Sequence, residues 1–129
     1  MNPATDKILE SNSYNEVASY IAYYFFEQCI ELYEKSLEID ENNVTALNGL
    51  GYVLACLNKD LMKALTYCKK AVDYSSESAA CLDSLGWVYF KLGLYKDARK
   101  YLEMFCEKSD IARRYVLKWM AIVAAAMSV

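Results

Sequence analysis

Two stretches of the chain repeat one pattern of residues about 35 positions apart. The first copy contains Leu47, Leu50, Gly51, Leu54, Ala64 and Cys68, and the second contains Leu82, Leu85, Gly86, Tyr89, Ala98 and Leu102. A self-similar period of this length is typical of stacked helical repeats rather than of a globule with one unique topology. Such arrays have no built-in chemistry, and their usual work is to offer a surface to a partner.

The repeated glycines need a structural reason. Glycine inside a helix costs about 1 kcal/mol relative to alanine, yet Gly51 and Gly86 occupy equivalent places in two apolar helices. A helix that lacks a side chain at one point lets a neighbouring helix approach closely, and Ala64 and Ala98 supply matching small residues. We therefore predict a close helix crossing at each of these glycines. If Gly49, two residues before Gly51, faces outward, its replacement by alanine should be neutral or stabilising.

The pattern resembles the tetratricopeptide repeat, in which a large residue and a Leu-Gly pair precede an aromatic residue, an alanine and a second large residue. The second copy matches it closely, and Gly93 and Tyr95 also stand where family members often have them. The first copy has one extra residue in the turn 57–62, which explains a period of 35 instead of the family's 34. Residues 33–43 look like the end of an earlier repeat, with Glu41 where the family has proline.

The resemblance implies an all-α fold, a short right-handed superhelical array of antiparallel helix pairs. The predicted divisions are a partly ordered N-terminal segment (1–13), a degenerate first repeat (14–43), a second repeat (44–78), a third repeat (79–109) and a C-terminal capping helix (110–129). Helices are expected at about 44–57, 61–74, 79–92, 95–108 and 110–127. Residues 40–43 are predicted to form a turn and a cap for the helix that follows them, and Glu77 and Ser78 are the candidate caps for the helix that begins near Ala79.

The first predicted repeat leaves one alternative open. Residues 14–24 and 25–37 both have helical spacing of apolar residues. A turn near residues 24–26 would make them a helix pair. Because no glycine or proline separates them, they could also form one bent helix.

The end of the chain is unusually apolar, with nine consecutive apolar residues at 119–127. This length is far short of the ~20 residues that span a bilayer. A capping helix should carry a polar outer face, which Arg113, Arg114 and Lys118 supply only at its start. Three interpretations remain open: a buried cap, a continuation into a further repeat, or a self-association surface. The last would be a homodimer through Trp119, Met120, Val123 and Met127.

Composition limits the partners and the compartment. The formal net charge of −3 argues against a nucleic-acid surface, which needs clustered Lys and Arg. The five cysteines are scattered and odd in number, which is typical of reduced intracellular thiols. A contact between Cys29 and Cys68 is plausible, but we expect no disulfide there. The polar first 14 residues have no secretory signal. We therefore expect a cytoplasmic protein with no membrane span.

Catalytic machinery is missing from the sequence. The chain has no histidine, the commonest general base and metal ligand, and no phosphate-binding or dinucleotide fingerprint. Four glutamates at helical spacing, Glu27, Glu31, Glu34 and Glu38, are better explained as a solvated helix face than as a metal cluster. We expect no enzymatic activity, no cofactor and no metal.

What remains is a binding surface. In the family that the chain resembles, the first helix of each repeat lines a concave groove. The resemblance places six partner-binding residues there: Asn48, Tyr52, Asp83, Trp87, Phe90 and Lys91. Aromatic residues dominate interface energetics, so Tyr52, Trp87 and Phe90 would form its floor. The alternative is that Trp87 and Phe90 pack on the terminal helix as core residues.

Two functions follow from this reading. The first is a non-enzymatic interaction module, an adaptor, scaffold or chaperone-like protein that binds a peptide or protein segment in the groove. The second is a structural module that self-assembles through its apolar C-terminal helix. Family members that grip chaperone tails use a clamp of basic residues and asparagine. The corresponding places here hold Asn48, Gly49, Tyr52, Ala80 and Ser84, so this use is not expected.

Overall fold

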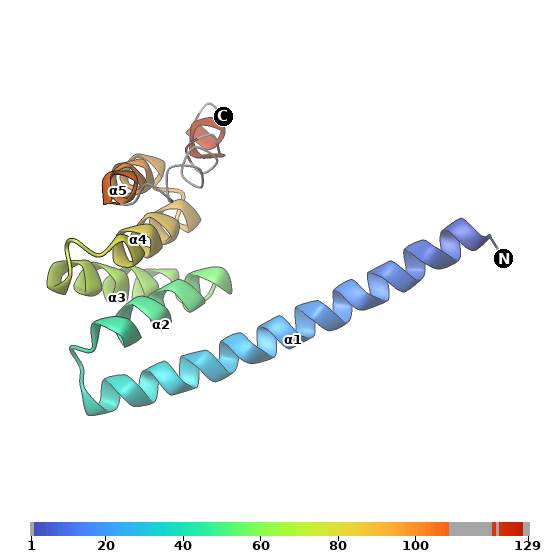
Figure 1. Cartoon of the computed structure of the whole chain (residues 1–129), viewed down its shortest axis with the longest axis horizontal. Helices are drawn as coiled ribbons and strands as arrows, with labels where there is room; N and C mark the ends of the chain where they lie inside the picture. The colour runs from blue at the N-terminus through green and yellow to red at the C-terminus, as the bar shows by residue number, and fades with distance from the viewer. Residues whose placement is uncertain (1, 109–119, 121, 128–129) are drawn as a thin grey trace.

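The computed structural model describes residues 2–108, 120 and 122–127, and within them it contains helices and turns but no strand (Figure 1). The five helices are α1 (Pro3–Ile39), α2 (Val44–Cys56), α3 (Leu61–Tyr74), α4 (Ala79–Lys91) and α5 (Tyr95–Lys108). Met120 and residues 122–127 are helical as well. The all-α helical-repeat fold is confirmed. Residues 109–119 of the predicted final helix lie outside the described residues.

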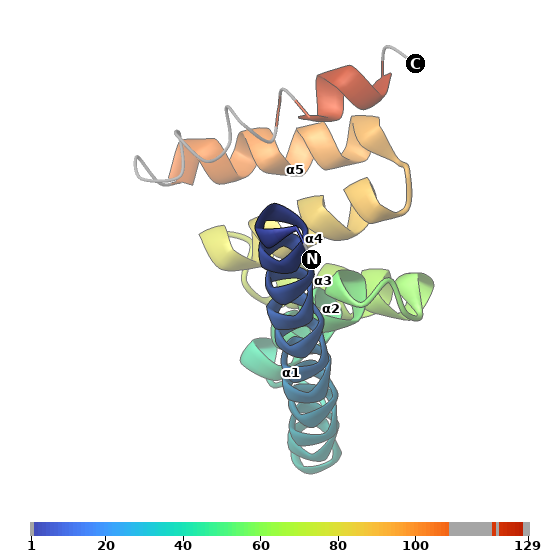
Figure 2. The same ribbon diagram turned by 90° about the vertical axis from the view of Figure 1, so that its right-hand side faces the viewer.

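The helices pack in sequential order. α2 packs on α3 and α4 on α5, while α2 and α3 both contact α4. Figure 2 shows α2 to α5 following one another from the lower to the upper part of the view, with the C-terminal residues next to α5. α1 packs on α2 through its C-terminal part, and its N-terminal part extends away from the array (Figure 1).

The repeated residues form the core. Leu47, Leu50, Leu82 and Leu85 are fully buried, as is Leu102. Burial of each such side chain contributes about 1.5–3 kcal/mol through the hydrophobic effect. The leucines that define the repeat in the sequence are therefore the residues that hold the array together.

The close crossings at the two repeated glycines are confirmed. A Cβ atom on Gly86 would lie 2.9 Å from Cγ of Leu102, and one on Gly51 would lie 2.3 Å from Sγ of Cys68. The Cβ atom on Gly51 would also lie 3.0 Å from the carbonyl oxygen of Ala64. Neither position has room for a side chain without displacing the paired helix.

Gly49 does not face outward, so the condition for a neutral alanine substitution is not met. This glycine is half-buried, and a Cβ atom there would lie 2.3 Å from Cζ of Tyr33. The ring of Tyr33 reaches from α1 into the space that the missing side chain leaves on α2. Gly49 therefore serves the contact between α1 and α2.

Side-chain caps begin both first helices. The backbone N–H of Ala46 donates to Oδ1 of Asn43 at 3.0 Å, and that of Cys81 donates to Oγ of Ser78 at 3.3 Å. Each bond satisfies a helix N–H group that has no partner within the helix. The two caps are one repeat period apart, and the predicted caps are confirmed.

The turns that follow α2 and α4 also correspond. Gly93 has a φ of 77°, and the N–H of Leu94 donates to the carbonyl of Tyr89 at 2.9 Å. Asn58 occupies the equivalent place after α2, with a φ of 54°. The turn after α2 is one residue longer, and the added Asp60 also has a positive φ of 47°. The predicted insertion is confirmed.

The predicted turn near residues 24–26 does not form, whereas partial order of residues 1–13 stays a prediction. One helix runs from Pro3 to Ile39, with the N–H of Ala4 donating to Oδ1 of Asn2 at its start. Counting back from the later repeats, Tyr24 stands where Gly93 makes its turn. A left-handed backbone is costly for an aromatic residue, by about 1–2 kcal/mol, so the helix continues. The alternative of one helix is therefore correct, and the repeat boundaries themselves stay a prediction.

Within the part of the chain that the structure describes, none of the helices combines the length and the hydrophobicity that crossing a bilayer requires.

Candidate partner-binding face

Four of the six predicted site residues come in two equivalent pairs. Asn48 and Tyr52 lie on α2, and Asp83 and Trp87 lie one repeat period later on α4. Because α2 and α4 contact each other, equivalent positions on them are neighbours. We call the surface formed by these four residues the α2–α4 face.

Tyr52 and Asp83 interact across the two helices. The pKa of the Tyr52 hydroxyl is raised, first by a side-chain hydrogen bond with Cys56, then by burial and by the negative charges of Cys56 and Asp83. Burial also raises the pKa of the Asp83 carboxyl. Among the described residues, no Lys or Arg forms an ion pair with Asp83. This carboxylate is therefore a desolvated negative charge that a ligand cation would stabilise.

Asn48 adds a second acceptor to the same face. Its Oδ1 atom is buried and has no hydrogen-bond partner among the described residues. An unsatisfied buried polar atom costs about 1–3 kcal/mol. A donor from a partner would remove that cost, so Asn48 and Asp83 both favour a ligand with N–H groups.

The remaining aromatic residues lie toward the end of α4. The rings of Trp87 and Phe90 stack at 5.8 Å with an interplanar angle of 22°. The Nζ atom of Lys91 lies 5.4 Å from the centre of the Trp87 ring, a cation–π contact. Trp87 is half-buried, whereas Tyr52 is 42% exposed.

Phe90 belongs largely to the core. Its ring centre lies 5.7 Å from that of Tyr95, and its side chain packs on Leu102 and Val123. The structure thus matches the interpretation in which Phe90 packs on the terminal residues. Its part in a binding surface is limited to the edge that it shares with Trp87.

The C-terminal residues pack on α5. Val123 is 1% exposed and packs with Leu102, and Met120 is partly buried in the same cluster. The expectation that Val123 is available to a second chain is therefore wrong, because its own chain already covers it. Ile122 and Met127 remain exposed, and Trp119 lies outside the described residues.

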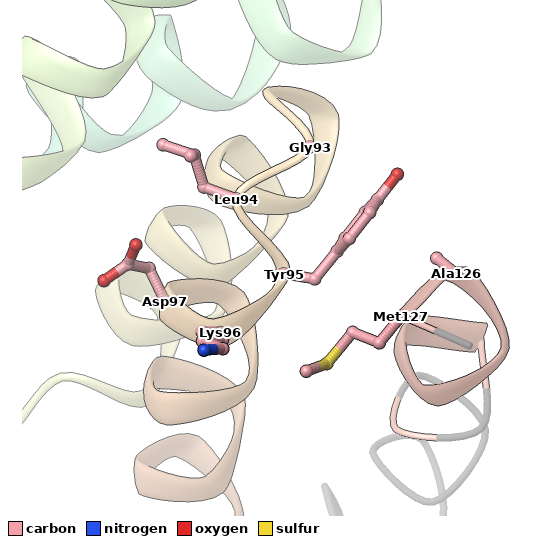
Figure 3. A pocket seen from close by; sticks show the side chains of 7 residues that line it. All are labelled: Gly93, Leu94, Tyr95, Lys96, Asp97, Ala126 and Met127. Carbon is pink, nitrogen blue, oxygen red and sulfur yellow. The ribbon is translucent and has the colours of Figure 1, made fainter. Parts of the chain in front are cut away.

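A hollow of about 430 Å³ separates these residues from the start of α5 (Figure 3). Figure 3 shows the side chains of Tyr95 and Met127 between the start of α5 and the C-terminal helix, while Leu94 and Asp97 point away. Its lining lacks a nucleophile paired with a base, the arrangement that covalent catalysis needs. The described residues also contain no group of three acidic, cysteine or histidine side chains close enough to hold a metal ion.

In the glutamate row on α1, Glu31, Glu34 and Glu38 are exposed, whereas Glu27 is half-buried. Glu31 pairs with Lys35 at 3.2 Å and Glu27 with Lys59 at 3.6 Å. All five cysteines are free thiols. Burial, together with the nearby Cys81, raises the pKa of Cys68 to about 12, so this thiol is not a nucleophile at neutral pH. Burial and the charge of Tyr101, whose ring stacks on Tyr89 at 5.5 Å, raise the pKa of Tyr89.

Comparison with known proteins agrees with the repeated geometry. Two family models described as tetratricopeptide repeat match residues 32–66 and 78–104. The chain belongs to the tetratricopeptide repeat family. Tetratricopeptide repeats generally form a non-enzymatic interaction fold. Their presence indicates a protein–protein interaction module.

Two relatives of this tetratricopeptide repeat protein are much longer than the matched segment. A TPR repeat-containing protein of Pseudomonas aeruginosa is 33% identical over 69 residues, which cover 54% of this chain and 12% of the relative. A BBSome complex member of Bos taurus is 32% identical over 83 residues, 64% of this chain and 16% of the relative. The similarity therefore spans less than a fifth of either relative.

One surface of this tetratricopeptide repeat protein was missed by the sequence reasoning. It is an apolar row on α1 that faces away from the array, and we call it the α1 outer face. Its members are Tyr14, Val17, Ile21, Tyr24, Phe25, Leu32 and Ile39, all exposed. Tyr24 at the position of a turn glycine was the signal that could have revealed it, because a straight α1 leaves this row uncovered.

Proposed function

We propose that this tetratricopeptide repeat protein binds a peptide or protein segment on the α2–α4 face. The observation that carries the proposal is the pairing of exposed Tyr52 with the desolvated carboxylate of Asp83. An aromatic ring beside a charged group gives apolar contact and orientation together, which is the composition of interface hot spots. Adaptor, scaffold and chaperone-like roles are all forms of this activity.

The chemistry of the face favours a particular kind of segment. Asn48 and Asp83 both accept hydrogen bonds, so the segment should present an Arg, a Lys or a free amide beside them. Tyr52 and Trp87 would hold an apolar side chain next to that donor. Lys91 at the far end would prefer an acidic group, which fixes the direction of the segment.

The same proposal includes a cytoplasmic location and excludes nucleic acid as the partner. Five free cysteines favour a reducing compartment, in keeping with the cytoplasm. The net charge of −3 disfavours nucleic acid as the partner.

Selection of a random peptide library displayed on phage, with the full chain as bait, tests the proposal. We expect enriched peptides that combine a basic residue with an apolar one. Tyr52→Ala should weaken binding of the best peptide at least tenfold, because truncation of a central aromatic anchor removes the main contact.

Tyr74→Ala is the matched control for this experiment. Tyr74 is an exposed tyrosine at the end of α3, away from the α2–α4 face. Its replacement should leave the peptide affinity within a factor of two. Equal losses in the two variants, or enrichment of acidic peptides, would contradict the proposed site.

Self-assembly through the C-terminal residues is the second candidate function. It is favoured by the exposure of Ile122 and Met127 beside the hollow of Figure 3. Met127→Glu should then shift the chain from dimer to monomer in light scattering. A dimer that survives this change would remove the candidate.

A further inference from the structure

The α1 outer face is the largest row of exposed apolar side chains in the described chain. Tyr14, Val17, Ile21 and Tyr24 are three or four residues apart, and Phe25, Leu32 and Ile39 follow Ile21 at intervals of four and then seven, so the seven residues share one side of the helix. Exposure ranges from 51% at Ile21 to 90% at Ile39. At 1.5 Å per residue the row is about 38 Å long. Contiguous apolar surface of this extent marks an interaction site.

The corresponding faces of the other second helices are polar. Exposed residues along α5 are Lys96, Arg99, Lys100, Glu103 and Glu107. Those along the middle of α3 are Lys63, Thr66, Lys69 and Asp73, with Met62 and Tyr74 near its ends. Solvated helices of this array thus carry charged outer faces, as soluble repeat arrays require. The apolar outer face of α1 departs from that rule, so we expect another protein surface to bury it.

The array itself does not cover this face. α1 packs on the core through Phe26, Ile30, Tyr33 and Leu37, which lie on a different side of the helix from Phe25, Leu32 and Ile39. A second molecule can therefore approach the outer face along its whole length without meeting α2 of the same chain.

The geometry points to a second copy of this chain as the occupant, with the two α1 helices packed antiparallel through their outer faces. An apolar row that meets itself across a two-fold axis gives a closed, isologous interface. Three aromatic and four aliphatic side chains, each more than half exposed, amount to on the order of 700 Å² per copy. Stable dimers bury about 800 Å² per partner, so the row is large enough.

Charge placement selects the antiparallel direction and its register. Lys7 and Glu10 precede the apolar row, and Lys35 and Glu38 follow its centre. If the two-fold axis passes between Ala22 and Tyr23, Glu10 lies opposite Lys35 of the second copy, and Lys7 lies opposite the second copy's Glu38. A parallel pair would instead place Glu10 against Glu10 and Lys35 against Lys35, which is repulsive.

Sedimentation velocity on the full chain, from about 1 to 100 µM, tests for the dimer. We expect dimer at the upper concentrations. Ile21→Glu, at the centre of the outer face, should raise the dissociation constant at least a hundredfold. Tyr23→Glu is the matched control, because Tyr23 is 56% exposed and lies on another side of α1 from Ile21. It should leave the dissociation constant within about threefold. A monomer at 100 µM, or equal effects of the two variants, would overturn the proposal.

Charge reversal tests the register. Glu10→Lys and Lys35→Glu should each weaken the dimer, because each places like charges opposite one another at two symmetric positions. The double variant should restore the dissociation constant to within about threefold of the original. Circular dichroism on every variant checks that α1 remains helical. A double variant weaker than both single variants would rule out the antiparallel register.

Discussion

Glycine has three different tasks in this chain, and each depends on a different neighbour. Gly51 and Gly86 admit the paired helix of their own repeat, whereas Gly49 admits a ring from the preceding helix. Gly93 is needed for its positive φ alone, since nothing lies within 4 Å of its missing side chain. The first task was predictable because the glycine and its alanine partner recur with the repeat. The second was not, because Tyr33 belongs to a different element.

The Gly86 crossing gives a direct stability prediction. Gly86→Leu should lower the free energy of unfolding by about 3 kcal/mol or more, because Leu102 and the backbone of Ala98 leave no space for the new side chain. Gly49→Ala should cost less, about 1 kcal/mol, because the far end of the Tyr33 side chain can move aside. Urea denaturation at neutral pH measures both. Equal losses would contradict the two packing environments.

Asp83 should make stability depend on pH in a specific direction. Burial raises its pKa in the folded chain above the ordinary 3.8, so the folded state binds the proton more tightly than the unfolded state. Stability from this group is therefore greatest at low pH and is lost as pH rises through the raised pKa. Asp83→Asn should melt at a higher temperature than the original chain at pH 7.

The difference in melting temperature between Asp83→Asn and the original chain should shrink as the pH falls toward 3.8, because Asp83 then becomes protonated in the unfolded state as well. Melting temperatures of both chains between pH 3.5 and 7.5 measure it. A variant that is less stable at pH 7 would instead show that Asp83 makes a favourable contact within the chain.

At the scale of elements, helix boundaries were predicted correctly where the turn contains a residue that tolerates a left-handed backbone. The turn after α4 contains Gly93 and the turn after α2 contains Asn58, the two residue types that tolerate a left-handed backbone. The helix boundaries around these turns were predicted to within one residue. Tyr24 has no such tolerance, and there the predicted turn failed. Helical periodicity alone cannot distinguish a helix pair from one long helix, because both halves present the same spacing.

The two equivalent turns allow a matched pair of substitutions. Asn58→Gly should raise the free energy of unfolding by about 0.5–1 kcal/mol, because glycine adopts a φ of 54° more readily than asparagine. Gly93→Ala should lower it by about 1–2 kcal/mol through left-handed strain. Thermal unfolding followed by circular dichroism measures both. A stabilising Gly93→Ala would show that the turn can change its conformation.

At the scale of the molecule, the positions of the α2–α4 face residues were predictable and the α1 outer face was not. Asn48, Tyr52, Asp83 and Trp87 could be placed because the repeat period fixes which positions on α2 and α4 are equivalent. Phe90 was harder to assign, because its exposure depends on how the C-terminal residues pack on α5. The α1 outer face depends on whether a turn forms at Tyr24, so no local pattern revealed it.

A dimer through α1 would present two α2–α4 faces on one particle. The outer face of α1 lies on the side of that helix away from α2, so dimerisation leaves both binding faces accessible. Two faces that bind a densely immobilised peptide together gain avidity, commonly by a factor of 10² or more. A peptide free in solution meets each face separately and gains nothing.

Ile21→Glu should therefore weaken binding to a peptide-coated surface and leave the affinity for the free peptide unchanged. For a peptide selected on the full chain, the dissociation constant in solution should stay within about twofold, because Tyr52 and Asp83 are untouched. On a surface dense in that peptide, the variant should dissociate at least tenfold faster than the original chain, and Tyr23→Glu should not. Calorimetry and surface plasmon resonance give the two values. If all three proteins dissociate from the peptide surface at the same rate, the two faces cannot reach neighbouring peptides together. If Ile21→Glu loses affinity for the peptide in solution, α1 contributes to the binding face.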